Sequence, residues 1–196
     1  GYPKLMVPGQ LMSVGATEMP LFLLTLFFGV GVAGFYSLAQ RVVAAPLVLV
    51  ANAIGDVYRQ RAAAQYANQG ECLDIFFASL KRLVIFAFLP MLSLLFLGPW
   101  LFAFVFGEAW RPSGEIASIL SVLLFFQISS SPLSSTVLLP GWLNFDSFWQ
   151  FLRVCAVGAA FYISDHVGAT YSTAVFLYVC VCSIFYMVHS YFQYQA

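Results

Sequence analysis

The sequence contains few charged residues. Asp, Glu, Lys and Arg make up 8% of its 196 residues, whereas a soluble domain carries about 25%. So few charges cannot cover a soluble surface, and a net charge of zero gives no field that attracts nucleic acid. The sequence also shows no Gly-rich phosphate loop, metal-ligand cluster or nucleophile motif. We therefore expect no nucleic-acid partner, no metal, no cofactor and no covalent catalysis.

Cysteine is scarce and poorly placed for metal binding. The four cysteines are Cys72, Cys155, Cys180 and Cys182. Cys180 and Cys182 would point about 200° apart on a helix, which makes them poor joint ligands. Three of the four lie in apolar segments, where cysteine packs as a small apolar residue. The cysteines predict neither a metal site nor a redox compartment.

Apolar residues are abundant instead: 62% of the chain is hydrophobic, and the mean hydropathy is +0.90. A helix needs about 20 apolar residues to cross roughly 30 Å of hydrocarbon. We predict six such segments, at 7–28, 35–57, 83–106, 116–139, 148–164 and 169–192. Only helices and closed barrels satisfy their backbone in lipid, and these segments lack the alternating polarity of barrel strands. The predicted fold is an all-α, polytopic membrane helix bundle with six transmembrane helices.

The basic residues predict its orientation. The connection after the second segment carries four of them, Arg59, Arg61, Lys81 and Arg82, while the opposite side has only Arg111. Because Lys and Arg mark cytoplasmic loops, both ends of the chain are expected in the cytoplasm. The same connection favours helices that extend beyond the membrane, with a stop at Asn68-Gln69-Gly70. We interpret its charges as a topology signal and a solvated face, in preference to a lipid-headgroup site.

Three charged residues lie inside the predicted spans, where each costs about 2.5–3.5 kcal/mol at mid-helix. Glu18 is expected near mid-membrane, Arg41 about 9 Å from the outer edge, and Arg153 about 8 Å from the cytoplasmic edge. Functionally, Glu18 could pair with an arginine or carry a proton, and the arginines could hold a phosphate through a bidentate fork. Structurally, the three could pair to fix helix register, or snorkel to an interface. The residues alone leave both interpretations open.

The run QISSSPLSST, residues 127–136, is unusually polar for a span. Its candidate cavity-lining residues are Gln127, Ser131, Pro132 and Ser134. The alternative is that its hydroxyl groups form hydrogen bonds between helices. Prolines also interrupt several spans, at positions 20, 46, 90 and 132, which suits a moving or cavity-lining bundle.

Three stretches share an ordered resemblance with a known family. FYSLAQRVVAAPLVLVANAIGDVYRQRAA, FGEAWRPSG (residues 106–114) and SPLSST (residues 131–136) resemble the second six-helix half of bacterial polysaccharide-transport flippases. These belong to the superfamily of multidrug, lipid-linked oligosaccharide and polysaccharide exporters. The resemblance implies that residues 1–196 are the C-terminal six-helix lobe of a two-lobed transporter in the bacterial inner membrane, a fragment without the N-terminal lobe.

That resemblance also implies a function. Similar proteins move undecaprenyl-diphosphate-linked oligosaccharide to the outer leaflet by alternating access, without enzymatic chemistry. It makes Arg41 and Arg153 candidate diphosphate contacts, whereas Glu18 matches no family motif. The expected partners are the lipid-linked oligosaccharide, membrane lipid, the N-terminal lobe and, as a candidate, glycan polymerase machinery.

Other functions remain alternatives. A multidrug antiporter of the same superfamily would be expected to use an acidic, aromatic cavity for cationic drugs. A non-transporting membrane scaffold would use its buried charges only for structure. A membrane glycan polymerase or acyltransferase is disfavoured, because such enzymes need a large loop or a catalytic His or Arg constellation and the outer loops here are short.

Overall fold

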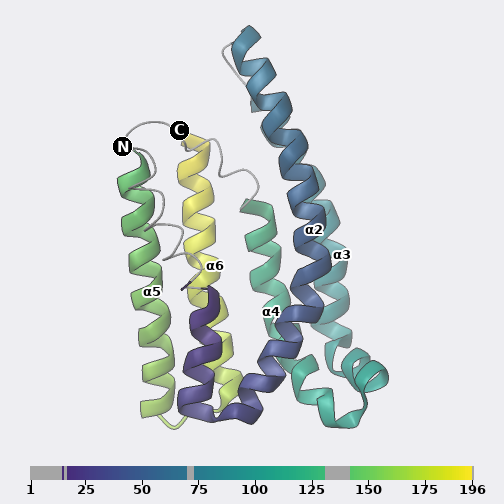
Figure 1. Ribbon diagram of the computed structural model, residues 1–196, viewed down its shortest axis with the longest axis vertical. Helices are drawn as coiled ribbons and strands as arrows, with labels where there is room; N and C mark the ends of the chain where they lie inside the picture. Colours follow the sequence, from purple (N-terminus) through teal and green to yellow (C-terminus); the bar gives the residue numbers. More distant parts are fainter. Residues whose placement is uncertain (1–14, 16, 70–72, 131–141, 196) are drawn as a thin grey trace.

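A computed structural model describes residues 15, 17–69, 73–130 and 142–195. These residues form helices joined by short turns, and no strand occurs among them. The elements are Thr17–Phe28 (helix 17–28), α2 (Val30–Gln69), α3 (Leu73–Phe106), the 3₁₀ helix η1 (Glu108–Trp110), α4 (Arg111–Ser130), α5 (Trp142–His166) and α6 (Tyr171–Gln195) (Figure 1). The all-α prediction is confirmed.

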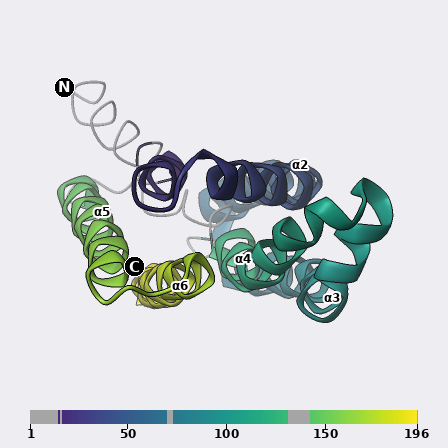
Figure 2. The same ribbon diagram turned by 90° about the horizontal axis from the view of Figure 1, so that it is seen from below.

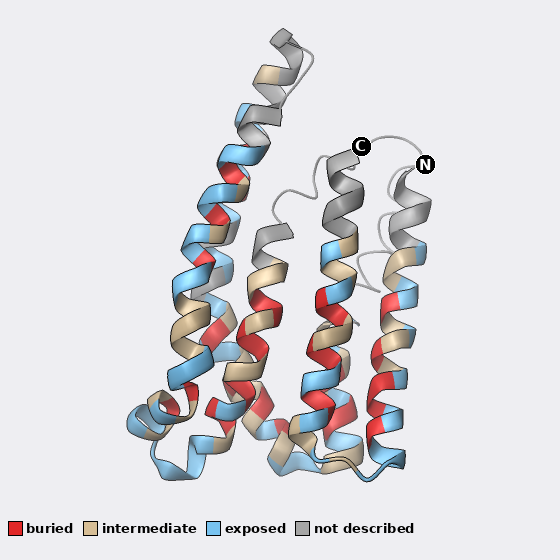
Figure 3. Ribbon diagram, turned by 180° about the vertical axis from the view of Figure 1, so that it is seen from behind, coloured by how far each residue is buried: buried red, intermediate tan, exposed pale blue. Residues whose placement is uncertain are grey.

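The helices lie in two rows when the bundle is seen along its length. Helix 17–28 and α2 form one row, and α5, α6, α4 and α3 form the other (Figure 2). α4 contacts α2, α3 and α6, and five of its residues belong to the hydrophobic core: Ile116, Ala117, Leu120, Leu123 and Leu124. Buried residues gather on the sides of the helices that face the bundle, while the outer sides are exposed (Figure 3). The core therefore sits around α4.

The outer surface of the bundle is apolar. On α3, Leu89 is 71% exposed and Phe96 is 76% exposed. Phe77–Phe106 and Tyr171–Val188 are long and apolar enough to cross a membrane, and only 17% of the most apolar part of the first is buried. The core helix of a soluble protein would be mostly buried, so this exposed apolar surface suits lipid instead. The fold is a helical membrane bundle, and six spans remain the predicted number.

Several predicted boundaries are confirmed. Helix 17–28 ends at Phe28 and α3 ends at Phe106, as the apolar segments indicate. α2 continues through the basic connection and ends at Gln69, within the predicted stop. Its 40 residues make it about 60 Å long, so α2 and α3 extend beyond the rest of the bundle (Figure 1).

Three predicted helix starts are wrong, and each helix begins earlier. α2 begins at Val30 because Gly29 alone, with a φ of +89°, forms the break. α4 begins at Arg111, and α5 begins at Trp142 within the predicted turn PGWLNFDS. Glycine costs only about 1 kcal/mol inside a helix, and Asn, Asp and Ser favour helix starts as well as turns. These residues are therefore compatible with the first turns of helices as well as with the turns that the sequence predicts.

Candidate functional site

Two of the three predicted intramembrane charges are exposed on the same row of the bundle. Glu18 belongs to helix 17–28 and Arg41 to α2, and both side chains are exposed. They lie eleven residues before and twelve residues after Gly29, the break between the two helices. Because the helices run in opposite directions from this break (Figure 1), both charges lie about 17 Å from it. Among the described residues, no ion pair joins them.

Two further polar residues lie on the side of α2 that carries Arg41, with the apolar residues Ala45 and Val48 between them and Arg41. Asn52 and Asp56 follow it by eleven and fifteen residues, or about 20° and 60° around the helix, and both are exposed. Arg41 lies about 17 Å from Gly29, where facing hydrocarbon would cost about 2.5–3.5 kcal/mol, whereas Asn52 and Asp56 lie about 35 and 40 Å from Gly29, beyond the roughly 30 Å of hydrocarbon. Arg41 is therefore suited to a water-filled cavity or to another protein surface.

Arg153, the third predicted charge, lies in the interior and is 7% exposed. It follows the first residue of α5, Trp142, by eleven residues, so it lies about 17 Å from that end of the helix. α5 begins six residues earlier than expected, so Arg153 lies farther from the start of its helix than predicted, and its depth of about 8 Å in the membrane remains a prediction. Arg153 therefore belongs to the middle of its helix, where snorkelling to an interface is harder.

Tyr186 of α6 holds the Arg153 guanidinium. Arg153 Nη1 donates a hydrogen bond of 3.0 Å to the Tyr186 hydroxyl, and Arg153 Cζ lies 5.4 Å from the ring centroid. No carboxylate forms an ion pair with Arg153 among the described residues. A hydrogen bond to a charged group contributes about 1.5–3 kcal/mol, so this contact ties α5 to α6.

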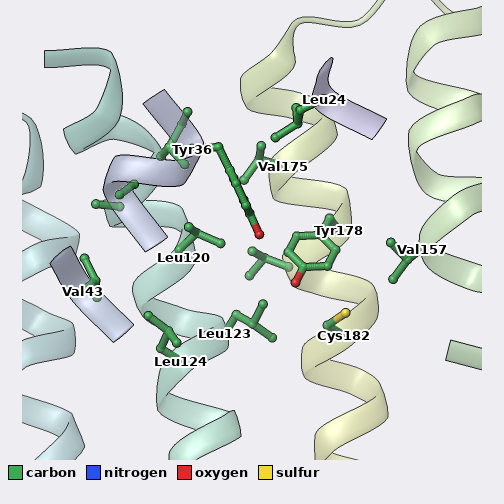
Figure 4. Close-up of a cluster of buried hydrophobic side chains, with 14 of the residues drawn as sticks. Leu24, Tyr36, Val43, Leu120, Leu123, Leu124, Val157, Val175, Tyr178 and Cys182 are labelled. Carbon is green, nitrogen blue, oxygen red and sulfur yellow. The ribbon is translucent and has the colours of Figure 1, made fainter. Parts of the chain in front are cut away.

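The polar groups beside this contact continue into the core. Tyr178 and Cys182 lie about two turns and one turn before Tyr186 on α6, and both are buried. Tyr36 of α2 is also buried, and its side chain and that of Tyr178 point toward one another (Figure 4). Tyr178 forms side-chain hydrogen bonds with Tyr36 and with Cys182. These tyrosines were not among the predicted site residues; only the eight-residue spacing of Tyr178 and Tyr186 places two of them on one side of a helix, and the contact with Tyr36 of α2 is tertiary.

The predicted cavity-lining residues are tested only in part. Gln127 lies near the end of α4 and is half-buried. Ser131, Pro132 and Ser134 lie outside the described residues, so the cavity remains a prediction. No group of three or more His, Cys, Asp or Glu side chains that could bind a metal ion occurs in the described part of the chain.

A family described as polysaccharide biosynthesis protein matches residues 2–115, more than half of the chain. The chain belongs to the polysaccharide biosynthesis protein family. No curated protein and no solved structure matches it. The family match includes Glu18 and Arg41 but not Arg153, so the two exposed charges, Glu18 and Arg41 (the charged row), lie in the part of the chain by which the family is recognised.

Family membership confirms the earlier resemblance at a coarser level. Two of the three quoted stretches, residues 35–63 and 106–114, fall inside the match, and SPLSST falls outside it. Together with the apolar outer surface, the family indicates a membrane protein of polysaccharide biosynthesis.

Proposed function

We propose that this chain is one lobe, the C-terminal one, of a flippase that moves undecaprenyl-diphosphate-linked oligosaccharide across the bacterial inner membrane. The observation that carries the proposal is the exposure of Glu18 and Arg41 at the same depth on one row of the bundle. Charges at that depth need a polar environment. A translocation cavity between this lobe and a second lobe would supply it, and family membership supports a role in polysaccharide biosynthesis.

Arg41 is the residue we assign to the diphosphate. Its guanidinium is always charged and presents a planar fork of donors, which fits two phosphate oxygens better than an ammonium group does. The exposed side chain can reach a ligand in front of α2. Transport of this kind makes and breaks no covalent bond, so the protein is proposed not to be an enzyme.

Glu18 and Arg153 receive different roles. Glu18 is exposed in the same row as Arg41, and we propose that it carries a coupling proton or pairs with Arg41 in another state of the cycle. Arg153 is buried and held by Tyr186, so a ligand in front of α2 would not contact it. We therefore propose that Arg153 fastens α5 to α6, in preference to the substrate contact that the resemblance implied.

The proposal includes an orientation and partners. The exposed basic residues Arg61, Lys81 and Arg82 lie toward the extended end of α2 and α3, and Arg111 lies at the opposite end. We propose that the extended end and both chain ends are cytoplasmic, as Lys and Arg bias indicates. The proposed partners are membrane lipid, the N-terminal lobe, the lipid-linked oligosaccharide and glycan polymerase machinery.

The test is rescue of glycan export by the full-length protein in a bacterial strain that lacks its own flippase. Arg41→Gln is expected to lower rescue by about tenfold or more, since a charge-assisted bidentate contact is worth at least about 1.5 kcal/mol. Arg41→Lys should retain part of the rescue of glycan export. Arg61→Gln is the matched control, because Arg61 is an exposed arginine of the same helix outside the charged row.

Membrane insertion of each variant is measured by quantitative immunoblotting of washed membranes. Full rescue by inserted Arg41→Gln would remove Arg41 from the substrate site. Resistance to cationic drugs without glycan export would instead support the multidrug antiporter.

A further inference from the structure

An apolar groove runs between α3 and α6, with α4 as its floor. Its volume is about 360 Å³, and it is lined chiefly by Leu95 of α3, Ile119 and Val122 of α4, and Val179, Ile184 and Met187 of α6. Sites for small molecules commonly measure about 300–1,000 Å³, so the groove can hold part of a ligand. Figure 2 shows α6, α4 and α3 side by side, on the side of the bundle that faces away from helix 17–28.

Beside the groove, α3 and α4 approach each other closely. A Cβ atom on Gly98 would lie 2.7 Å from the Gly114 carbonyl oxygen, so the two helices meet backbone to backbone. Ser118 Oγ donates a hydrogen bond of 2.7 Å across this contact to the Leu94 carbonyl. Small residues allow such close crossings in membranes. α6 packs against α4 but forms the opposite wall, which leaves a valley over Ile119 and Val122.

The groove lies at hydrocarbon depth. Its α6 wall runs from Phe176 to Met187, five to sixteen residues after the helix start, or about 8–24 Å along the span. The rim residues Leu95, Phe176 and Ile184 are exposed, so the groove opens outward. The outer surface of α3 beside it is the apolar surface already assigned to lipid. The groove is thus continuous with the protein–lipid interface.

We propose that this groove binds an acyl chain of a bilayer phospholipid and that the chain is a structural part of the lobe. At this depth, the hydrocarbon chains of lipids are the abundant apolar molecules, and their concentration favours occupancy by mass action. The groove faces away from the charged row: on α6, Met187 lies nine residues, or about 180°, from the core residue Tyr178. Occupancy therefore does not depend on the transported substrate, and the inference goes beyond the proposed function.

Two serines line the groove: Ser118, which is hydrogen-bonded to Leu94, and Ser183. Ser183 is 6% exposed, and its hydroxyl has no hydrogen-bond partner among the described residues. Because this hydroxyl makes no hydrogen bond there, removing it breaks none, whereas a larger side chain at this buried position also carries an overpacking cost. Ser183→Phe would place an aromatic ring where the chain is proposed to lie. Ser183→Ala removes the hydroxyl and leaves the space open.

The experiment uses the full-length protein in vesicles that contain a phospholipid with a diazirine in its acyl chain. After irradiation, mass spectrometry maps the label on peptides of α4 and α6. The proposal expects label on groove residues and a loss of about fivefold or more in Ser183→Phe and in Ile184→Trp, because each fills the space of the chain. Ile184→Trp is the second variant because its exposed rim position cannot disturb the core.

The matched controls are Ser183→Ala and Leu89→Trp, which adds the same indole to the exposed outer surface of α3. Both should retain the labelling of the wild-type protein. Equal labelling of the groove and of the Leu89 surface would overturn the proposal, because it would show unspecific lipid contact. Displacement of the phospholipid label by an equal amount of polyprenyl phosphate would also overturn it, and so would cross-links between two copies of the chain at the groove.

Discussion

Replacing Gly114 by alanine tests how closely α3 and α4 must approach. A Cβ atom at this position would lie 2.6 Å from Pro99 Cα and 2.8 Å from the Gly98 carbonyl carbon. Both are backbone atoms, so no side chain can rotate away. To restore an ordinary contact of 3.4 Å, the helices would have to separate by about 0.8 Å. That separation would stretch the hydrogen bond from Ser118 Oγ to Leu94 from 2.7 Å to about 3.5 Å, where it is lost.

The magnitude follows from three contributions. Overpacking costs about 1–3 kcal/mol and the lost hydrogen bond about 1 kcal/mol, while replacing glycine inside a helix returns about 1 kcal/mol. Gly114→Ala should therefore lower the free energy of unfolding by about 1–3 kcal/mol. The control is Gly34→Ala in α2, where an added Cβ meets nothing within 4 Å and stability should stay equal or rise by up to about 1 kcal/mol.

The assay is unfolding of the purified protein by SDS in mixed micelles, followed by tryptophan fluorescence. Trp100 and Trp110 lie near the crossing in sequence and report on its loss. If Gly114→Ala were as stable as Gly34→Ala, the close approach of the two helices would be refuted.

Two further predictions concern polar contacts. In a double-mutant cycle of Arg153→Met and Tyr186→Phe, the same SDS assay should give a coupling energy of about 1.5–3 kcal/mol, and additive effects would contradict the contact at 3.0 Å. At the exposed turn after α3, Arg111 donates hydrogen bonds of 2.7 and 2.8 Å to Glu108 and lowers the pKa of its carboxyl below the usual 4.5. Because the pKa is lower in the folded protein, this ion pair contributes above pH 4.5 and is lost as the pH falls through the lowered value. An NMR titration should show the Glu108 pKa returning to its usual value in Arg111→Gln, and an unchanged pKa in that variant would disprove the contact.

The helical membrane fold could be predicted because its signals are strong. Low charge and long apolar runs have few other physical solutions, and helix ends at Phe28, Gln69 and Phe106 follow from clear changes in composition. The starts at Arg111 and Trp142 could not be predicted, because Gly, Pro, Asn and Asp occur both in turns and in first helical turns.

Only the charged site residues could be predicted from the sequence. Glu18 and Arg41 were found from their cost in hydrocarbon, and the structure exposes both on one row. Arg153 lies farther from the start of α5 than predicted, because α5 begins six residues earlier. Tyr36, Tyr178 and Tyr186 were missed because a tyrosine in a membrane helix carries little cost, so only tertiary packing shows that they meet.

The length of α2 has a mechanical consequence. About 60 Å of helix is twice the roughly 30 Å of bilayer hydrocarbon, so about half of α2 must project into water. The projecting half works as a lever whose pivot lies in the membrane. A rotation of about 10° at the pivot would carry its tip sideways by about 5 Å over about 30 Å of projecting helix. Because Arg41 belongs to the same continuous helix, a ligand that tilts α2 at Arg41 would move its distant tip. Transport could then be followed by a fluorescent label on the aqueous side, far from the substrate.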